Sequence, residues 1–544
     1  MKLRSKTAFV VCCALCILPA ALFGQTDVSS DGRQVTTFTK VISPAGLAVS
    51  PTGEVFVSSD GNGAIKTVEN IGNIFRYVDT NNDGVADETT TFVSKFNSPR
   101  GMCFVDGTLY VVHPPFLSAF RDEDGDGVAE IRKTLVTSLG FDYKYRGADH
   151  SSNDVRMGID GWLYLAIGDY GLPGATGTDG KQVFHRGGCV ARVRPDGTEF
   201  EIFADGTRNI YDVAVDPYLN AFTRDNTNDG GRWNVRLNHI TSMAHFGYPS
   251  LYMNFKNEIM KPLADFGGGS GTAALYLHEP GFPDHVSDTL LTGDHVKNQG
   301  AVFSHSLSAN GASFKLEPKD GQILLNVQQI TDMDVDGRSR LFASSWKNSN
   351  VVCLSYPSLR AATFPDLKKA RDTALLEHLI ARSQVCRLNA QREILNRGSK
   401  QVFVEGLTKI AAGDDPLYAR VAALFTLKQL GGEKSHETLI KLAAQDDLRE
   451  FALRALADRK TQLRGVPTVL FVKALEDSNP RVRLQALIGL ARLNQAITAA
   501  AVMPLLTDND PVVAHTAVRT LVALKAVEPC LEVMATGSSS PTVE

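Results

Sequence analysis

In the first two thirds of the chain, short runs of alternating apolar and polar residues are separated by turns rich in Gly, Asp, Asn and Pro, which predicts β-strands. One unit recurs: an apolar run, a turn glycine and a second apolar run, as in GLAVSPTGEVFVSS (46–59). The turn glycines Gly53, Gly107 and Gly161 are 54 residues apart, and residues 34–358 have room for six such units. Because radial closure removes exposed sheet edges, we predict an all-β six-bladed β-propeller over 34–358; a β-sandwich would not need so regular a period.

After about residue 358 the apolar spacing becomes helical, Ala, Leu and Arg dominate, and Gly becomes scarce. Each unit begins with an Asp or Asn that can cap a helix, often followed by Pro in the first turn. The units start 31 or 32 residues apart, at Asp414, Asp446, Asp477 and Asp508. They resemble HEAT repeats, in which pairs of helices stack into a solenoid. We therefore predict a multidomain chain, with an all-α HEAT-like solenoid over 362–530 and a disordered tail over 531–544.

The N-terminus has the pattern of a secretory signal. The basic segment MKLRSK precedes the apolar run TAFVVCCALCILPAALF, and cleavage is expected near Gly24. An uncleaved anchor is the alternative, which the short apolar run disfavours. We therefore expect residues 1–24 to be a signal peptide. The mature protein is expected to be exported, periplasmic or secreted, and to contain no membrane span.

Composition and cysteine usage exclude several classes of function. The formal net charge of -4 gives no basic field for nucleic acid, so no nucleic-acid partner is expected. Three of the eight cysteines lie in the signal peptide, and the other five are scattered without a CxxC or CxxCH motif. This argues against a disulfide scaffold, a zinc ribbon and an attached c-type haem.

Two acidic loops, DTNNDGVADE (79–88) and DEDGDGVAE (122–130), place oxygen-bearing side chains at alternate positions, then a Gly, then a further acid. Calcium takes about 6–8 oxygen ligands and tolerates irregular geometry. An EF-hand would need a Glu where Thr90 and Lys133 stand, so these are not EF-hands; solvated acidic turns are the alternative. We predict two structural calcium sites, with ligands Asp79, Asn81, Asp83 and Asp87 in the first loop and Asp122, Asp124, Asp126 and Glu130 in the second.

His150 stands in a polar run before a strand-like segment, HSSNDVRMGIDGWLYLAIGDYG (150–171). This stretch resembles one in the soluble quinoprotein glucose and sorbosone dehydrogenases, where a histidine before a GxDGxLYxxIGD strand is the general base. The resemblance implies that His150 takes a proton from a sugar-like alcohol or aldehyde while hydride passes to pyrroloquinoline quinone (PQQ). Imidazole, with an ordinary pKa of about 6.5, suits this role. The alternative is a histidine that only hydrogen-bonds a turn.

The next segment, CVARVRPDGTEFEIFADGTRNIYDVAVDP (189–217), also resembles that family. The match implies that Arg208 and Asn209 contact the cofactor, and that Lys297, in DHVKNQGAVF, is a cofactor-binding lysine. A guanidinium and an amide suit quinone oxygens and carboxylates. An equally simple interpretation is that Arg208 and Asn209 anchor the loop between two blades.

The sequence departs from the family pattern at two places. Gln329 and Thr331, in QITDM, stand where the family has two cofactor-binding arginines. PQQ is a tricarboxylate, so the loss of two cations is expected to weaken its binding greatly. The glutamate of the family's calcium loop is also replaced, around Trp233 and Asn234.

The whole layout, over roughly 40–530, resembles large proteins described as membrane-bound dehydrogenases, which join such a propeller to HEAT repeats and usually end in a c-type cytochrome. The cytochrome part is missing here, so the expected electron acceptor is a separate protein such as a cytochrome c. The HEAT repeats are expected to bind a protein partner. Two functions stay open. One is a PQQ-dependent sugar dehydrogenase-like oxidoreductase, favoured by His150; the other is a non-catalytic carbohydrate- or protein-binding propeller, favoured by Gln329 and Thr331.

Overall fold

The computed structural model describes residues 27–535, apart from residues 30, 64, 149, 228–233, 253, 297–298 and 362. The predicted signal peptide, residues 536–544 and Lys297 lie outside the described residues.

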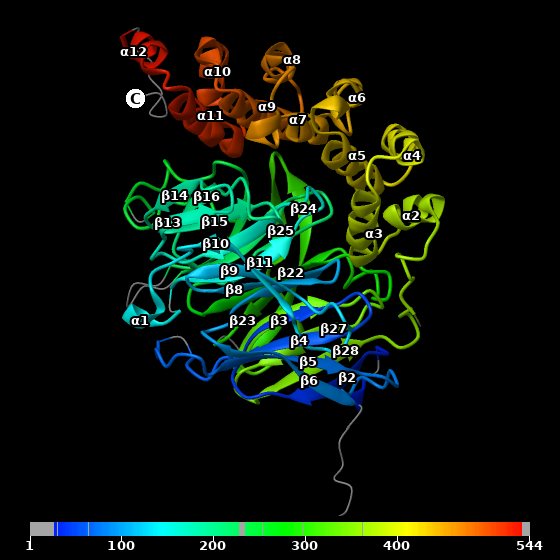
Figure 1. Ribbon diagram of the computed structural model, residues 1–544. Coiled ribbons are helices and arrows are strands. Elements are labelled where there is room, and N and C mark those ends of the chain that lie inside the picture. Colours follow the sequence, from blue (N-terminus) through cyan, green and yellow to red (C-terminus); the bar gives the residue numbers. More distant parts are fainter. Residues whose placement is uncertain are drawn as a thin grey trace, which may run out of the picture.

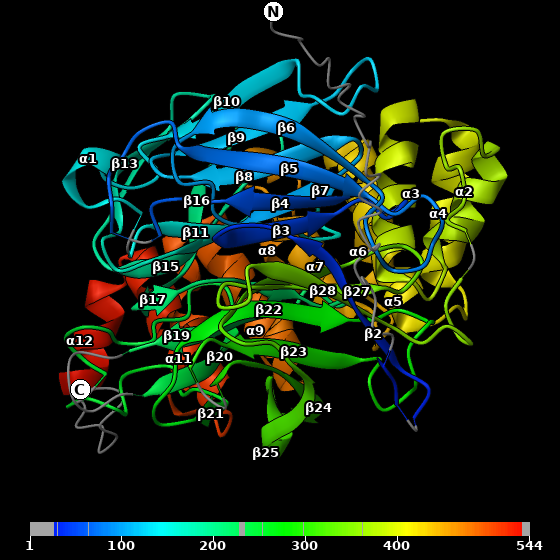
Figure 2. The same ribbon diagram turned by 90° about the horizontal axis from the view of Figure 1, so that it is seen from below.

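Six antiparallel sheets form a ring, so the predicted six-bladed propeller is confirmed (Figures 1 and 2). The first strands of neighbouring blades contact each other all the way round. Blade 1 contains β3 (Pro44–Val49), β4 (Val55–Ser59), β5 (Gly72–Val78) and β6 (Glu88–Phe96), and blade 2 contains β7 (Met102–Val105), β8 (Thr108–His113), β9 (Phe116–Arg121) and β10 (Ile131–Thr137). Helix α1 (Tyr143–Arg146) follows blade 2.

Blade 3 contains β11 (Ser152–Met157), β12 (Leu163–Ile167), β15 (Gly188–Val193) and β16 (Glu201–Thr207), and its hairpin of β13 (Leu172–Gly177) and β14 (Gln182–His185) pairs with β10 of blade 2. Blade 4 contains β17 (Asn209–Ile210), β18 (Ala214–Val215), β19 (Ala221–Asn226), β20 (Val235–Ile240) and β21 (Ala264–Asp265). Blade 5 contains β22 (Gly271–Leu277), β23 (Thr289–Asp294), β24 (Ala301–Asn310) and β25 (Ser313–Asn326).

Blade 6 combines both ends of the propeller sequence. Its strands are β26 (Ile330–Val335), β27 (Leu341–Ser345), β28 (Asn350–Ser355), β2 (Gln34–Lys40) and β1 (Asp27–Val28). β2 pairs with β28, so Gln34 lies opposite Ser355 and the N-terminal strand closes the ring. This closure pairs an edge of the last blade that would otherwise be open.

Alternation within the strands explains how the blades pack. In β4, Val55 and Val57 pack toward Phe342 of blade 6, whereas Phe56 on the other face packs toward Leu109 of blade 2. Both faces of a blade are therefore buried against its neighbours, and the strand pattern is apolar on both sides. The recurring turn glycines adopt left-handed backbone, with φ of 98° at Gly53. Only glycine adopts this conformation without steric cost, which explains the recurrence.

The helices after the propeller form paired repeats, as the sequence predicts. The first are α2 (Asp372–Leu379), α3 (Gln384–Arg397), α4 (Gln401–Ala412), α5 (Leu417–Gly431), α6 (His436–Leu442) and α7 (Arg449–Ala457). The others are α8 (Thr468–Ala474), α9 (Pro480–Leu493), α10 (Ala499–Val502), α11 (Pro511–Leu524) and α12 (Val527–Ala535). Asn479 and Asp510 cap α9 and α11 with their side chains, and a proline follows each cap. The first five residues of the expected disordered tail, 531–535, are helical.

The solenoid packs against one end and the edge of the ring (Figure 1). Helices α3, α5, α7, α9 and α11 form the row nearer the propeller, and α4, α6, α8 and α10 lie outside it. Trp162 of blade 3 donates its indole N–H to Asp458 at 2.7 Å. The tip of the long β24–β25 hairpin reaches the N-terminus of α11, where the Ala312 amide donates to Asp510 at 2.7 Å. In the described part of the chain, no helix is long and apolar enough to span a bilayer.

Candidate functional site

His150 lies at the end of the ring that faces away from the contact with α3 and α5. It comes just before β11, whereas the turn after β11 meets the helices, since the Ile159 carbonyl accepts hydrogen bonds from Gln391 and Gln429. Six residues of extended strand separate the two ends of β11, roughly 20 Å. We call this the His150 end of the propeller.

The β11–β12 hairpin brings His150 and Asp169 together. Ser152 pairs with Ile167, so the residues just outside both strands lie side by side. His150 Nδ1 hydrogen-bonds Asp169 Oδ1. A Cβ at Gly168 would lie 2.4 Å from the His150 carbonyl oxygen, so the glycine of the IGD motif is needed for this close approach. The His150 side chain is 17% exposed and the Asp169 side chain 14%, so solvent reaches the pair.

The surroundings of Asp169 favour the ionised form of its carboxyl group. Burial raises its pKa, but the hydrogen bond from His150 and the charges of His150 and Arg208 lower it more, and the net pKa of Asp169 lies below its ordinary value. A carboxylate at Nδ1 favours the imidazole tautomer with a proton on Nδ1 and a lone pair on Nε2. The pair therefore has the arrangement of an oriented general base.

Arg208 is paired with the same carboxylate, that of Asp169. Its Nε is 3.9 Å from Asp169 Oδ2 and donates to the Tyr248 hydroxyl at 3.2 Å. The Tyr248 hydroxyl donates in turn to Asp169 Oδ2 at 3.5 Å. Two residues singled out from sequence, His150 and Arg208, thus meet at Asp169. We call His150, Asp169, Arg208 and Tyr248 the His150 network.

Asn209 is tied to the same region by β11. The Asn153 amide donates to the Asn209 side-chain oxygen at 3.3 Å and to the Ile210 carbonyl at 2.7 Å. Asn209 therefore joins blade 4 to blade 3 a few residues from His150. This contact agrees with the interpretation that Asn209 anchors the loop between two blades. It also places the Asn209 amide at the His150 end.

Two members of the network could not be assigned from sequence as site residues. Asp169 is the last residue of the IGD motif, but the sequence does not indicate that it pairs with His150. Tyr248 lies in the loop after β20 of another blade, and no local pattern connects it with His150. Tyr170, with its ring centroid 5.5 Å from that of His150, adds an aromatic surface beside the imidazole.

Of the two residues that stand where the resemblance implies arginines, Thr331 makes hydrogen bonds inside the fold, whereas Gln329 is half-buried. The Thr331 hydroxyl donates to the Pro44 carbonyl at 3.0 Å and lies 2.7 Å from the Ser344 hydroxyl. Thr331 is 5% exposed, so it holds blades 6 and 1 together rather than facing a ligand. Gln329 has φ of 51° and accepts from the Trp346 amide through its carbonyl.

Of the two acidic loops, the second has the geometry of a cation site. Ligand oxygens of Asp122, Asp124, Asp126 and Glu130 all lie within 4.8 Å of one another, the one such group among the described residues. Asp122 is held in place because it accepts the Gly125 and Gly127 amides at 2.7 and 2.8 Å. Three of the four residues are exposed to solvent.

The first loop differs from the predicted calcium site. Asp79 pairs with Arg340 of blade 6 at 2.6 Å, with both side chains fully buried, and Arg340 also pairs with Asp336 at 2.7 Å. Asp87 accepts the Thr80 amide and hydroxyl, both at 2.8 Å. Asp79, one of the four residues that the sequence pattern assigns to a metal, is therefore already paired with a guanidinium. Asn81 and Asp83 cap backbone amides of the same loop.

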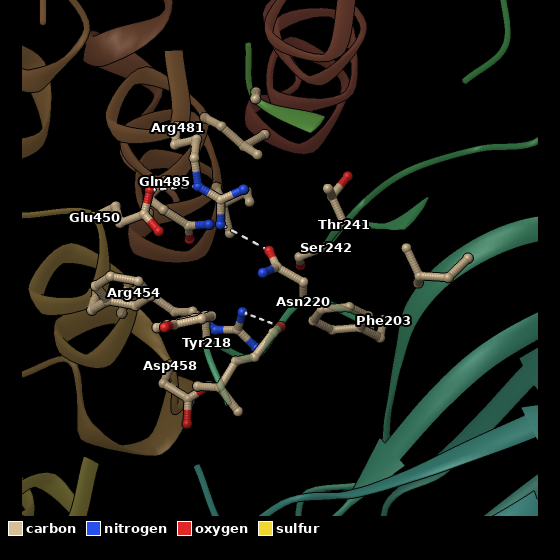
Figure 3. Close-up of a pocket in the computed structure, with 18 of the residues that line it drawn as sticks. Phe203, Tyr218, Asn220, Thr241, Ser242, Glu450, Arg454, Asp458, Arg481 and Gln485 are labelled. Carbon is tan, nitrogen blue, oxygen red and sulfur yellow. Dashed lines mark hydrogen bonds and ion pairs between the residues drawn. The ribbon is translucent and has the colours of Figure 1, made fainter. Parts of the chain in front are cut away.

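A cavity of about 40 Å³ lies between blade 4 and helices α7 and α9 (Figure 3). Arg481 donates to Asn220 at 2.8 Å across it, and Arg454 donates to the Leu219 carbonyl at 2.9 Å. It has room for a few water molecules. Its position at the junction, with arginines already paired, indicates a hydrated contact between the two domains.

Comparison with known proteins agrees with this division of the chain. Residues 33–322 match the model of a domain of unknown function, DUF7133, and residues 467–536 match the HEAT repeats. The chain belongs to the DUF7133 family, since the match spans more than half of it. No curated protein matches the chain.

Several solved structures are similar to the propeller. The PQQ domain of pyranose dehydrogenase from Coprinopsis cinerea is 13% identical over 62% of this chain and 99% of its own, with a TM-score of 0.44. The PQQ-bound aldose sugar dehydrogenase from Streptomyces coelicolor is 16% identical over 61% and 99%, with a TM-score of 0.43. The gluconolactonase XC5397 from Xanthomonas campestris is 14% identical over 59% and 89%, with a TM-score of 0.37. At these identities and scores, the functions of these proteins do not transfer to this chain.

Proposed function

We propose that the His150 end of the propeller binds a sugar-like alcohol or aldehyde and that His150 removes a hydroxyl proton in a dehydrogenase-type reaction. The observation that supports this most is the connected network of His150, Asp169, Arg208 and Tyr248, drawn from three separate segments. The sequence around His150 resembles the general-base segment of quinoprotein sugar dehydrogenases. Structural role alone would not require an imidazole oriented by a carboxylate at a partly exposed position.

Each residue of the His150 network would have its own role in the proposed reaction. His150 Nε2 accepts the hydroxyl proton, and Asp169, already ionised, stabilises the imidazolium that forms. Arg208 and Tyr248 hold the second oxygen of Asp169, so the carboxylate keeps its orientation. The Tyr170 ring, beside the imidazole, offers an apolar face of the kind that suits the C–H face of a sugar ring.

PQQ is the electron acceptor that the resemblance implies, and it would supply the site that accepts hydride. The described residues do not fit it. PQQ carries three carboxylates, but Thr331 is buried between blades and Gln329 is neutral, so of the described positions in the family pattern only Arg208 is a cation. Arg208 is itself engaged with Tyr248 and with the Asn226 carbonyl at 3.1 Å. Our proposal for these residues is therefore limited to substrate binding and proton transfer.

The same observations favour a second candidate. A propeller that lost the cofactor cations would keep the fold and the polar His150 end as a non-catalytic carbohydrate- or protein-binding module. Thr331 fits this candidate, because its hydroxyl makes buried hydrogen bonds between blades at a position where the family has a cofactor-binding arginine. The solenoid would then be a platform for a protein partner. Export, a separate electron-acceptor protein and calcium at the second acidic loop complete the proposal.

Two measurements on the full mature chain separate the candidates. The first is uptake of PQQ by calcium-loaded protein, followed by dye reduction over a panel of sugars and sugar alcohols. The second is calorimetric binding of the same panel. Reduction that His150→Gln abolishes supports the enzyme. Sugar binding with no reduction, by protein that remains folded, supports the binding module. Neither binding nor reduction contradicts both.

A further inference from the structure

Residues 243–248, which we call the Tyr248 segment, run along the outer strand of blade 3. The Asp205 amide of β16 donates to the Ala244 carbonyl at 2.9 Å. Further along, the Tyr248 amide donates to the Gly206 carbonyl at 2.9 Å. These bonds fix the segment against β16 and bring its last residue, Tyr248, to the His150 network.

Helix α11 of the solenoid holds the same segment from the other side (Figure 1). His515 Nε2 accepts the His245 amide at 3.1 Å. Arg519, one turn further along α11, donates from Nε to the Met243 carbonyl and from Nη2 to the Asp205 carboxylate, both at 3.3 Å. The last part of the solenoid therefore contacts, through two side chains, a segment that ends in the candidate site.

The bond at His515 depends on the charge of its imidazole. A ring nitrogen can accept a hydrogen bond only through a free lone pair, whereas an imidazolium has N–H donors at both nitrogens. Protonation of His515 would therefore replace the acceptor with a donor that faces the His245 N–H. The contact between α11 and the Tyr248 segment is lost in that state.

The charged and titratable groups around His515 oppose its protonation. Arg519 lies on the same helix, and His245 Nδ1 donates to Asp205 Oδ1 at 2.6 Å. His185, at the end of β14, is the third imidazole of the group, and its Nε2 is buried without a hydrogen-bond partner among the described residues. One carboxylate, that of Asp205, thus faces a guanidinium and three imidazoles. Acid would gather positive charge here that one carboxylate does not balance.

The pH range follows from these surroundings. Burial is the main cause that lowers the pKa of His515 to about 4, and the charges of Arg519 and His245 lower it further, whereas the Asp205 carboxylate raises it by less. A released His515 has the ordinary pKa of about 6.5, so between these two values it takes up a proton that the held form does not. The contact is therefore fully formed above about pH 6.5 and weakens as the pH falls toward 4.

We propose that the solenoid positions Tyr248 through His515 and Arg519 of α11, and that protonation of His515 releases this hold. Both are positioning residues, since they contact the Tyr248 segment rather than the His150 network itself. This gives the solenoid a part in the candidate site that is separate from binding a partner. The hold stands on the contacts of α11 alone; its effect on a reaction at the His150 end rests on the proposed function.

Hydrogen exchange of the full chain tests the hold, with rates at pH 7.5 and pH 5.5 corrected for the intrinsic pH dependence of exchange. The test variant is His515→Gln, because a glutamine oxygen can accept the His245 amide but does not titrate. The matched control is His285→Gln, at an exposed position on the propeller. In wild type and the control, we expect protection of the Tyr248 segment to fall about 10-fold at pH 5.5, as one pH unit below the released pKa requires.

In His515→Gln the same protection should change less than about twofold, because the titrating group is gone. Equal pH dependence in wild type and His515→Gln, or unchanged protection in wild type, would overturn the proposal. Arg519→Gln is a second variant, needed if His515→Gln does not fold. It should lower protection already at pH 7.5 and lose less on acidification, since a charge that opposes protonation of His515 is removed. Protection like that of wild type at both pH values would also overturn the proposal.

A kinetic measurement extends the test to the site. On a substrate from the sugar screen, kcat/KM of wild type should fall more between pH 7.5 and 5.5 than that of His515→Gln. Parallel profiles would show that the hold does not reach the reaction. The exchange experiment needs no substrate, so failure of the proposed function and failure of the hold give different results.

Discussion

The indole N–H of Trp162, in the turn of blade 3, donates to the carboxylate of Asp458, 296 residues further along the chain and just after α7. The same carboxylate accepts from Arg192 Nη1 at 3.0 Å, and the Arg192 guanidinium lies 4.2 Å from the Trp162 ring. Arg192 also pairs with Glu201 at 2.7 Å. The propeller and the solenoid are therefore joined through a buried, charged contact.

We predict that Asp458→Ala destabilises the docked state by about 3–5 kcal/mol, because it leaves Arg192 buried with fewer counter-charges. Thermal unfolding of the full chain would measure the loss, and limited proteolysis between 356 and 372 would report undocking. Asp446→Ala, at an exposed position on the same solenoid, is the matched control. A variant as stable and as protease-resistant as wild type would show that this contact is dispensable.

Replacing the proposed base should remove activity without unfolding the protein. On any substrate that the screen identifies, we expect His150→Gln to lower kcat by about 10²–10⁴-fold, since general-base catalysis contributes in this range. Asp169→Asn should show a smaller loss, because the imidazole remains but loses its orienting carboxylate. The exposed His285 serves as the control, and His285→Gln should retain wild-type kcat. Unchanged turnover in His150→Gln would contradict the proposed role.

Glu279 predicts a pH dependence of stability. It is 1% exposed, its Oε1 accepts the Val385 amide of α3 at 3.0 Å, and burial raises its pKa to about 7 from 4.5. Between these two values the folded state holds a proton that the unfolded chain has released, so stability falls as pH rises from about 4.5 to 7. The shift corresponds to roughly 3 kcal/mol.

The measurement is the unfolding free energy of wild type and Glu279→Gln at pH 5 and pH 8. Glu279→Gln should lose less stability than wild type between these pH values, because glutamine does not titrate. Comparing the two proteins cancels the contribution of other buried acids. Parallel pH profiles would show that Glu279 is not protonated in the folded state.

The two acidic loops should respond differently to substitution. We expect Asp126→Asn, in the second loop, to lower bound calcium by one equivalent, because its carboxylate is one of four within 4.8 Å. Asp83→Asn, at the corresponding position of the first loop, should leave bound calcium unchanged, since Arg340 holds Asp79 there. Metal analysis after dialysis distinguishes the two, and equal losses in both variants would support a calcium site in each loop.

The fold was predictable because its signals repeat. The glycine at each turn of the first strands reports a local requirement for left-handed backbone, and Gly53, Gly107 and Gly161 meet it in the structure. The helical period of the solenoid likewise depends on local spacing. The helix caps were predictable only in part: Asn479 and Asp510 cap their helices, whereas α5 and α7 begin without a side-chain cap.

Contacts between distant segments were not predictable. The first acidic loop has a calcium-like sequence, but Arg340, 261 residues away in blade 6, provides the positive charge. Tyr248 contacts Arg208 and Asp169, the partner of His150, because segments of blades 3 and 4 converge at one end of the ring. The inner row of solenoid helices packs on the propeller of the same chain, which the repeat pattern alone does not indicate (Figure 1). A protein partner for the solenoid stays a prediction.

Closure of the ring by β2 sets the order in which this protein can fold. Gln34 pairs with Ser355, so β2, one of the first strands to be synthesised, cannot pair with β28 until nearly the whole propeller has been made. Such a long separation in sequence slows folding, because the entropy of closing the loop must be overcome before the final contacts form. Completion of the propeller therefore has to wait for the end of blade 6, and a chain cut between these two strands would have to refold from two fragments that meet by diffusion.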